Sequence, residues 1–428
     1  CNLCVEVCPA KDRQNPEIKA INMMSRLEHV EEEKVNYEYF LNLPEIDRSK
    51  LERIDIRTSQ LISPLFEYSG ACSGCGETPY IKLLTQLYGD RMLIANATGC
   101  SSIYGGNLPS TPYTTDANGR GPAWANSLFE DNAEFGLGFR LTVDQHRQRV
   151  MRLLSEFADK LPAELNAALH AEATPEVRRE QVAALRQALA GVAGAEELLT
   201  DADALVEKSV WLIGGDGWAY DIGFGGLDHV LSLTENVNIL VLDTQCYSNT
   251  GGQASKATPL GAVTKFGEHG KRKARKDLGV SMMMYGHVYV AQISLGAQLN
   301  QTVKAIQEAE AYPGPSLIIA YSPCEEHGYD LALSHDQMRQ LTATGFWPLY
   351  RFDPRRADEG KIPLALDSRP PSDALAETLL NEQRFRRLNA QQPEVAERLW
   401  KDAAADLQKR YDFLAQLAGK AEKSPSEG

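Results

Sequence analysis

The segment Ser209-Val-Trp-Leu-Ile-Gly-Gly-Asp-Gly-Trp218 joins a short apolar run to a glycine-rich turn. A short run of apolar residues bounded by turn residues is typical of a strand that is buried on both faces. Further glycines follow at Gly223, Gly225 and Gly226, where the pattern changes to that of a helix. The segment therefore predicts a strand over 209–214, a tight turn and a helix over 222–234.

The same alternation continues on both sides of this segment. Further strands are expected at 91–95, 238–243, 287–293 and 316–321, and a further helix at 296–311, with a long glycine-rich loop over 247–277. Strands that alternate with helices form parallel sheets, because each parallel pair needs a crossover connection. The sequence therefore predicts an α/β fold with a doubly wound, mostly parallel sheet.

The chain is expected to divide into four parts. These are a cysteine-rich segment at 1–25, an acidic connector at 26–65, the sheet domain at 66–345 and a last part at 346–428. Within the sheet domain, residues 141–207 have apolar positions at helical spacing and predict a helical insertion, in which Thr174-Pro175 is typical of a helix start. The last part should hold an extended surface arm over 345–375, helices at 372–390 and 392–418, and a disordered end at 423–428.

Composition excludes some classes of function. The 428 residues carry a formal net charge of -14, which argues against a partner that is nucleic acid or an anionic membrane. The sequence has neither an apolar run long enough to span a bilayer nor a secretion signal, so we expect a cytoplasmic protein. The eight cysteines fall in short-spaced groups or just after expected strands, which indicates metal rather than disulfides. Because the chain begins at Cys1 rather than at Met, we expect it to be part of a longer polypeptide.

Several residues that can bind metals follow directly after expected strands. They are Cys100, Asp216, Thr244 and Cys324. In an open parallel sheet, ligands bind beyond the carboxyl ends of the strands, so these side chains should meet at one edge. Asp216 could supply an oxygen to Mg²⁺ bound to a diphosphate, while glycines and a helix start would hold the phosphates. A lone Gly-Asp-Gly is also compatible with a turn that has a capping aspartate.

Four of the cysteines form the stronger signal. Cys72, Cys75, Cys100 and Cys324 supply four thiolates, which is the number that a 4Fe-4S cluster requires. Zinc also accepts four thiolates, and unrelated thiols are a third alternative. The neighbouring cofactor site favours the cluster, because a redox-inert ion would have no use beside it.

Two resemblances follow from these motifs. The pairing of Gly215-Asp216-Gly217 with Thr244, 28 positions after the aspartate, resembles the motif of thiamine-diphosphate enzymes, although Asn is usual where Thr244 stands. The presence of Thr244 in place of this Asn narrows the resemblance to the oxidoreductase branch of the family. Four longer stretches are similar to those of the pyruvate:ferredoxin (flavodoxin) oxidoreductases: Phe66-Glu-Tyr-Ser-Gly-Ala-Cys-Ser-Gly-Cys-Gly-Glu-Thr-Pro79, Ala95-Asn-Ala-Thr-Gly-Cys-Ser-Ser102, Gly214-Gly-Asp-Gly-Trp-Ala-Tyr-Asp-Ile-Gly223 and Tyr247-Ser-Asn-Thr-Gly-Gly-Gln253.

The resemblance implies a role for each matching residue. It implies that Cys72, Cys75, Cys100 and Cys324 hold the 4Fe-4S cluster nearest the thiamine diphosphate, and that Asp216, Thr244 and the Cys246 carbonyl bind Mg²⁺. Asn249 is then the residue expected to face the substrate. The residues expected to contact the cofactor are Glu77, Cys100, Gly215, Asp216, Gly217, Trp218, Thr244, Gln245, Cys246, Tyr247, Ser248 and Asn249.

The resemblance also implies a reaction and its partners. It implies oxidative decarboxylation of pyruvate, or another 2-oxoacid, with coenzyme A to give acetyl-CoA and CO₂. Electrons would pass from thiamine diphosphate through 4Fe-4S clusters to ferredoxin or flavodoxin, and a homodimer is expected. The family's activating glutamate lies in an amino-terminal domain outside this chain, so we expect that the chain alone does not turn over efficiently.

The run Cys1, Cys4, Cys8-Pro9 resembles the second half of a two-cluster ferredoxin whose first cysteine is missing, so the remaining ligands are expected upstream. A non-redox thiamine-diphosphate enzyme and an electron-transfer scaffold are the alternative functions. We interpret the basic run 271–276 as a solvated loop. We expect His269 and His327 near the edge of the active site and assign neither a catalytic role.

Overall fold

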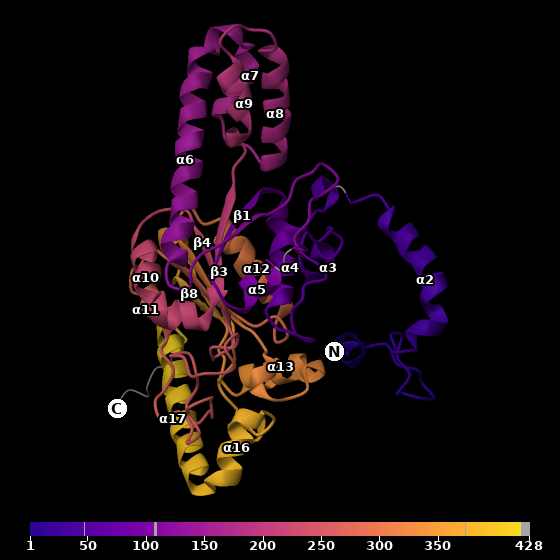
Figure 1. Ribbon diagram of the computed structural model, residues 1–428. Coiled ribbons are helices and arrows are strands. Elements are labelled where there is room, and N and C mark those ends of the chain that lie inside the picture. The colour runs from indigo at the N-terminus through magenta and orange to yellow at the C-terminus, as the bar shows by residue number, and fades with distance from the viewer. Residues whose placement is uncertain (47, 107–108, 373, 421–428) are drawn as a thin grey trace.

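The computed structural model describes residues 1–46, 48–106, 109–372 and 374–420 (Figure 1). Within these ranges the chain forms one eight-stranded sheet in the order β2-β1-β3-β4-β6-β5-β7-β8. The strands are β1 (Met92–Asn96), β2 (Ala123–Asn126), β3 (Ser209–Gly215), β4 (Asn238–Asp243), β5 (Tyr289–Ile293), β6 (Ser316–Tyr321), β7 (Tyr350–Phe352) and β8 (Leu364–Leu366).

All neighbours from β2 to β5 pair in parallel, whereas β7 pairs antiparallel with both β5 and β8. The predicted α/β fold with a mostly parallel sheet is confirmed. Because β1, β3, β4 and β6 are consecutive in the sheet, the residues that follow them lie along one continuous edge. The sheet thus brings together segments that are far apart in the sequence.

Helices cover both faces of the sheet. On one face α4 (Thr78–Tyr88), α5 (Cys100–Gly105) and α12 (Leu299–Glu310) share a core with Trp211 and Ile213 of β3. On the other face α6 (Asn132–Glu156), α10 (Phe224–Ser232), α11 (Leu278–Met283) and α17 (Pro393–Leu417) share a core with Leu212. Alternate residues of β3 therefore point into different cores, which explains why every residue of its apolar run is buried.

The helical insertion has a core of its own. Helix α6 leaves the sheet and joins α7 (Ala163–His170), α8 (Pro175–Ala188) and α9 (Glu196–Asp201) in a projection that stands clear of the sheet in Figure 1. Apolar side chains between Val150 and Val206 form a separate cluster there. The hydroxyl oxygen of Thr174 accepts a hydrogen bond from the Val177 N–H and caps α8. Helix α6 begins at Asn132, earlier than the predicted start of the insertion at 141, because its first turns pack on the sheet.

The prediction of an extended surface arm over 345–375 was wrong. This segment contains β7 and β8, which extend the sheet, and Tyr350, Leu364 and Leu366 are buried. After them come α15 (Leu375–Leu379), α16 (Gln383–Gln391) and α17, in place of the two expected helices. Helices α13 (Ser334–Ala343) and α14 (Arg355–Asp358) precede and follow β7. The end predicted to be disordered, 423–428, lies outside the described residues.

The first part of the chain is mostly exposed. It contains α1 (Leu3–Val7), α2 (Arg26–Leu41) and α3 (Ile56–Ser59), and α2 stands to one side of the sheet domain in Figure 1 with no buried residue. Among the helices of the described residues, none is both long and apolar enough to cross a bilayer.

Candidate functional site

Three oxygen atoms converge where β3 and β4 end. The Thr244 hydroxyl oxygen lies 3.0 Å from Oδ1 of Asp216 and 3.1 Å from the carbonyl oxygen of Cys246. A hydroxyl has one proton and can donate it to only one of these acceptors. In an octahedron with Mg²⁺–oxygen distances of about 2.1 Å, adjacent oxygens stand about 3 Å apart. The spacing of the oxygens therefore fits a divalent cation.

The electrostatics of Asp216 agree with this assignment. The side chain is 1% exposed, and its Oδ2 accepts a hydrogen bond of 2.5 Å from the Ser255 hydroxyl. Burial and, next in size, the charge of Asp243 raise the pKa of Asp216 to about 8. A bound cation reverses such a shift, because it stabilises the ionised carboxylate.

Residues 243–245 form the turn that presents these oxygens. Gln245 adopts a left-handed conformation with φ of 61°, which is strained for a residue with a side chain. Asp243 Oδ1 accepts a hydrogen bond from the Gln245 N–H at 3.0 Å, and the Gln245 carbonyl accepts one from the Thr258 hydroxyl at 2.7 Å. The Gln245 side-chain oxygen accepts a further bond of 2.7 Å from Arg384 of α16. These contacts hold both the backbone and the side chain of Gln245 in place.

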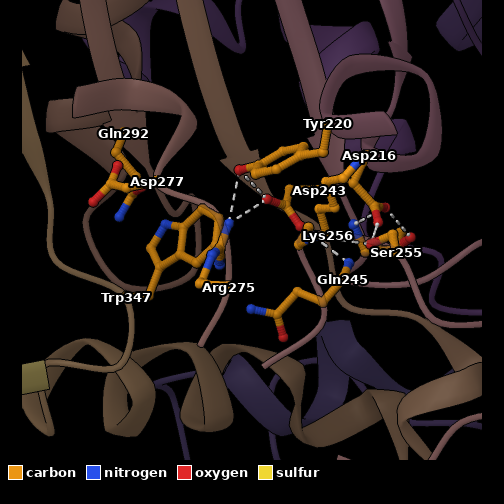
Figure 2. A network of polar contacts seen from close by, with 12 residues as sticks. Asp216, Tyr220, Asp243, Gln245, Ser255, Lys256, Arg275, Asp277, Gln292 and Trp347 are labelled. Carbon is orange, nitrogen blue, oxygen red and sulfur yellow. Dashed lines mark hydrogen bonds and ion pairs between the residues drawn. The ribbon is translucent and has the colours of Figure 1, made fainter. Parts of the chain in front are cut away.

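A buried ion pair lies behind the turn. Figure 2 shows Asp243 between Tyr220 and Arg275, with Oδ2 of Asp243 at 2.7 Å from each of them. The Arg275 guanidinium also lies 4.7 Å from the centre of the Trp347 ring. The interpretation of 271–276 as a solvated loop was therefore wrong for Arg275. It was also wrong for Lys271, whose ammonium donates to the carbonyls of Ser255, Lys256 and Thr258.

A cavity of about 150 Å³ opens beside the three oxygens. It begins at the π-helical turn Gly217–Ile222, where the first N–H groups of a helix have no partner within the helix and can bind anions. A Cβ on Gly217 would lie 2.6 Å from the Tyr247 ring, so only glycine fits there. The residues predicted to contact a cofactor that line this cavity are Glu77, Cys100, Gly215, Asp216, Gly217, Trp218, Cys246, Tyr247, Ser248 and Asn249.

A second cavity of about 150 Å³ adjoins the first. Its lining includes Cys72, Cys75, Cys100 and Cys324, so the fold brings all four predicted cysteines to one place. A Cβ on Gly76 would lie 2.3 Å from Pro323, and the Gly76 N–H donates to the Pro323 carbonyl at 2.9 Å. This close approach holds the loop that carries Cys75 against the segment that carries Cys324.

Of the four cysteines, Cys72 is exposed and the other three are partly buried, and the pKa of each thiol is raised. Burial, together with the charge of Glu77, raises the pKa of Cys100 to about 12. The pKa values of Cys72 and Cys75 are raised chiefly by burial, and that of Cys324 by a hydrogen bond with Cys246 and by burial. Thiolates at such a site require a bound cation. Across the described residues, no three His, Cys, Asp or Glu side chains are grouped closely enough to hold one metal ion.

The two cavities share part of their lining. Glu77, Cys100, Ser248 and Asn249 line both, and the Cys100 sulfur lies 3.4 Å from the Ser248 hydroxyl oxygen. Glu77 is buried and accepts a hydrogen bond of 3.0 Å from Tyr104, and burial raises the pKa of Glu77 to about 7. Groups bound in the two cavities would therefore be neighbours.

The amino-terminal cysteines lie close to this region. Cys1 and Cys4 are exposed and Cys8 is buried. A Cβ on Gly74, between Cys72 and Cys75, would lie 3.1 Å from the Cβ of Cys1. The amino-terminal segment therefore packs on the loop that carries the first two cysteines of the second cavity.

Two predicted residues contribute in other ways than expected. Thr244 lines the second cavity and not the first, and Gln245 lines neither, because its side chain points to Arg384. Sequence reasoning missed Ser255, Arg275 and Arg384 as parts of this site, and it placed His327 near the site without a catalytic role. The basic run did single out Arg275, but the pattern contains no signal that would place its side chain inside the protein.

Comparison with known proteins gives consistent matches. Residues 163–320 match the family model described as thiamine pyrophosphate enzyme, C-terminal TPP binding domain. The chain is 92% identical over 427 residues to a probable pyruvate-flavodoxin oxidoreductase of Escherichia coli (strain K12) and 54% identical over 431 residues to a pyruvate-flavodoxin oxidoreductase of Rhodospirillum rubrum. It is 46% identical over 435 residues to a pyruvate:ferredoxin oxidoreductase of Moorella thermoacetica.

These matches cover 100%, 99% and 98% of this chain but 36% of each relative, so the chain spans about a third of their length. Among solved structures, a 2-oxoglutarate:ferredoxin oxidoreductase from Magnetococcus marinus aligns over 68% of this chain and 82% of that chain. Its TM-score of 0.38 and identity of 15% are too low to support an inference.

Proposed function

The chain belongs, over its own length, to the pyruvate-flavodoxin oxidoreductases, and from this premise we propose that it carries two adjoining cofactor sites of such an enzyme. The first cavity is assigned to thiamine diphosphate with Mg²⁺, and the second to a 4Fe-4S cluster. The reaction we propose for the whole enzyme is oxidative decarboxylation of pyruvate with coenzyme A to acetyl-CoA and CO₂, with ferredoxin or flavodoxin as electron acceptor.

The observation that carries this proposal is the shared wall between the cavities. Asp216 and Cys246 line the first cavity with the Thr244 hydroxyl beside them, and four cysteines border the second. Cys100 belongs to both. A non-redox thiamine-diphosphate enzyme would need the first set alone, and an electron-transfer scaffold would need the second set alone.

The residues of the chain have distinct roles in this proposal. Asp216, Thr244 and the carbonyl of Cys246 hold Mg²⁺, and the turn that begins at Gly217 binds the diphosphate. Thiamine diphosphate supplies the chemistry of decarboxylation when it is bound, and the cluster supplies electron transfer. Glu77, which is buried and borders both cavities, holds a proton between them, and the exposed Asn249 faces the substrate at their entrance.

The remaining partners are proposals as well. Cys1, Cys4 and Cys8 would ligate further clusters together with cysteines outside this chain, and the closeness of Cys1 to Gly74 supports an electron path from the second cavity. We also propose a homodimer in the cytoplasm. Since the chain spans 36% of its relatives, we expect it to bind the cofactors without efficient turnover.

Titration of the anaerobically purified chain with thiamine diphosphate tests the proposal, with and without Mg²⁺ and with iron analysis in parallel. We expect Mg²⁺-dependent binding that Asp216→Asn abolishes, together with bound iron and sulfide. Cofactor binding without iron would favour the non-redox alternative. Iron without cofactor binding would favour the electron-transfer scaffold.

A further inference from the structure

His327 connects the two cavities through the backbone of their proposed ligands. Its side chain is buried, and Nε2 lies 2.7 Å from the carbonyl oxygen of Thr244, a proposed Mg²⁺ ligand. Its Nδ1 lies 3.4 Å from the backbone nitrogen of Cys324, a proposed cluster ligand. A single imidazole ring therefore spans from the metal-binding turn after β4 to the cysteine-bearing segment after β6.

The two contacts require a defined state of the ring. A carbonyl only accepts a hydrogen bond and a backbone N–H only donates one, so Nε2 must carry the proton and Nδ1 must be bare. Burial and the charge of Arg384 lower the pKa of His327 well below its usual value, which keeps the ring neutral. The ring lies 6.0 Å from the centre of the Tyr321 ring and 6.4 Å from that of Tyr329, so aromatic neighbours restrict its rotation.

We propose that His327 is a positioning residue that couples the Mg²⁺ and thiamine-diphosphate site to the cluster site by fixing Thr244 and Cys324 relative to each other. The inference rests on the proposed function and adds to it a route by which occupation of one cavity changes the other. The Thr244 hydroxyl and the Thr244 carbonyl belong to the same residue, so a cation that fixes the hydroxyl also restricts the backbone whose carbonyl accepts the hydrogen bond from His327. The ring links this restriction to the backbone N–H of Cys324, which donates to Nδ1.

Two substitutions separate the two contacts. The amide nitrogen of Gln stands near the place of Nε2, so His327→Gln keeps the bond to Thr244 and loses the one to Cys324. The amide oxygen of Asn stands near the place of Nδ1, so His327→Asn keeps the bond to Cys324 and loses the one to Thr244. His287→Gln is the matched control, because His287 Nε2 also holds a backbone carbonyl, that of Leu233, at 2.9 Å.

The experiment uses the anaerobically reconstituted chain and needs no turnover. Calorimetry measures thiamine-diphosphate binding with Mg²⁺, and EPR-monitored titration measures the cluster's midpoint potential with and without thiamine diphosphate. We expect His327→Asn to weaken thiamine-diphosphate binding by about tenfold, since it leaves a buried carbonyl without its donor. His327→Gln should bind nearly as well as wild type. In wild type and His287→Gln, thiamine diphosphate should shift the midpoint potential, and both His327 variants should lose this shift.

The outcomes separate this inference from the proposed function. If wild type binds both groups but shows no shift, or if the shift survives in both His327 variants, the coupling role is overturned. If wild type binds neither group, the proposed function itself is contradicted, and this inference with it. Near-UV circular dichroism shows whether each variant is folded. If one His327 variant does not fold, the other tests the coupling role, which requires that this variant lose the shift of the midpoint potential.

Discussion

At the scale of single residues, the site is defined by three oxygens that the fold brings together where β3 and β4 end. The Thr244 hydroxyl oxygen has two acceptors within 3.1 Å and one proton to donate, and the neighbouring Asp216 is buried. Asp243, whose charge also acts on Asp216, is neutralised by Arg275 on its far side. A small divalent cation at the point where the three oxygens meet would stabilise the ionised form of Asp216.

The Thr244 hydroxyl is therefore expected to be necessary for metal binding. Thr244→Val keeps the shape of the side chain but removes one of the three oxygens, so we expect Mg²⁺-dependent binding of thiamine diphosphate to weaken by about tenfold or more. Thr244→Ser keeps the oxygen and should retain binding close to that of wild type. Calorimetric titration of both variants checks this, and equal binding by Thr244→Val and wild type would exclude Thr244 as a ligand.

Sequence reasoning identified Asp216, Thr244 and the four cysteines because each follows a strand or lies in a short, dense motif. It did not identify the residues that support them. Ser255 contacts Asp216 from 39 residues away, and Arg384 contacts Gln245 from 139 residues away. Such contacts depend on how loops and helices pack on the sheet. A single serine or arginine has no local sequence pattern that would predict them.

At the scale of elements, the strands that the sequence predicted are those with apolar side chains on both faces. Strands β3, β4 and β6 are almost wholly buried and read as continuous apolar runs. Strands β7 and β8 were missed because each has only three residues, in a segment rich in Pro, Arg and Asp. Strand β2 was missed because its four residues, Ala123–Asn126, are partly or fully exposed.

Helix α16 reaches back to the metal-binding turn and should stabilise it. Arg384 donates to Glu382 at 2.6 Å and to Gln245 at 2.7 Å, and both charged side chains are buried. We expect Arg384→Met to lower the free energy of unfolding by about 3 kcal/mol, because it leaves the Glu382 carboxylate buried without its partner. The double change Arg384→Met with Glu382→Gln should recover part of this loss in chemical denaturation, whereas no recovery would mean that the ion pair is not the cause.

The helical insertion should be energetically separate from the cofactor site, because its core between Val150 and Val206 is its own. Leu185 is fully buried in that core. We expect Leu185→Ala to destabilise the insertion by about 3 kcal/mol and to speed hydrogen exchange in α7, α8 and α9. Binding of thiamine diphosphate should remain that of wild type. A comparable loss of cofactor affinity would show that the insertion supports the site.

At the scale of the whole molecule, the order of the strands is what makes the two cavities neighbours. β1, β3, β4 and β6 are adjacent in the sheet, and Cys100, Asp216, Thr244 and Cys324 follow them along one edge. The loop with Cys72 and Cys75 then closes over Pro323, where Gly76 permits the close approach. Thiol groups separated by up to 252 residues in the chain would thereby share one cluster.

The most direct test of the central claim is anaerobic iron and sulfide analysis with EPR on the reconstituted chain, comparing wild type with Cys324→Ser. Cys246→Ser is the matched control, because Cys246 is a neighbouring buried cysteine whose sulfur is not assigned to the cluster. We predict a 4Fe-4S signal in wild type and Cys246→Ser that Cys324→Ser abolishes or greatly weakens. Bound zinc instead of iron, or a cluster signal indifferent to Cys324→Ser, would contradict the account.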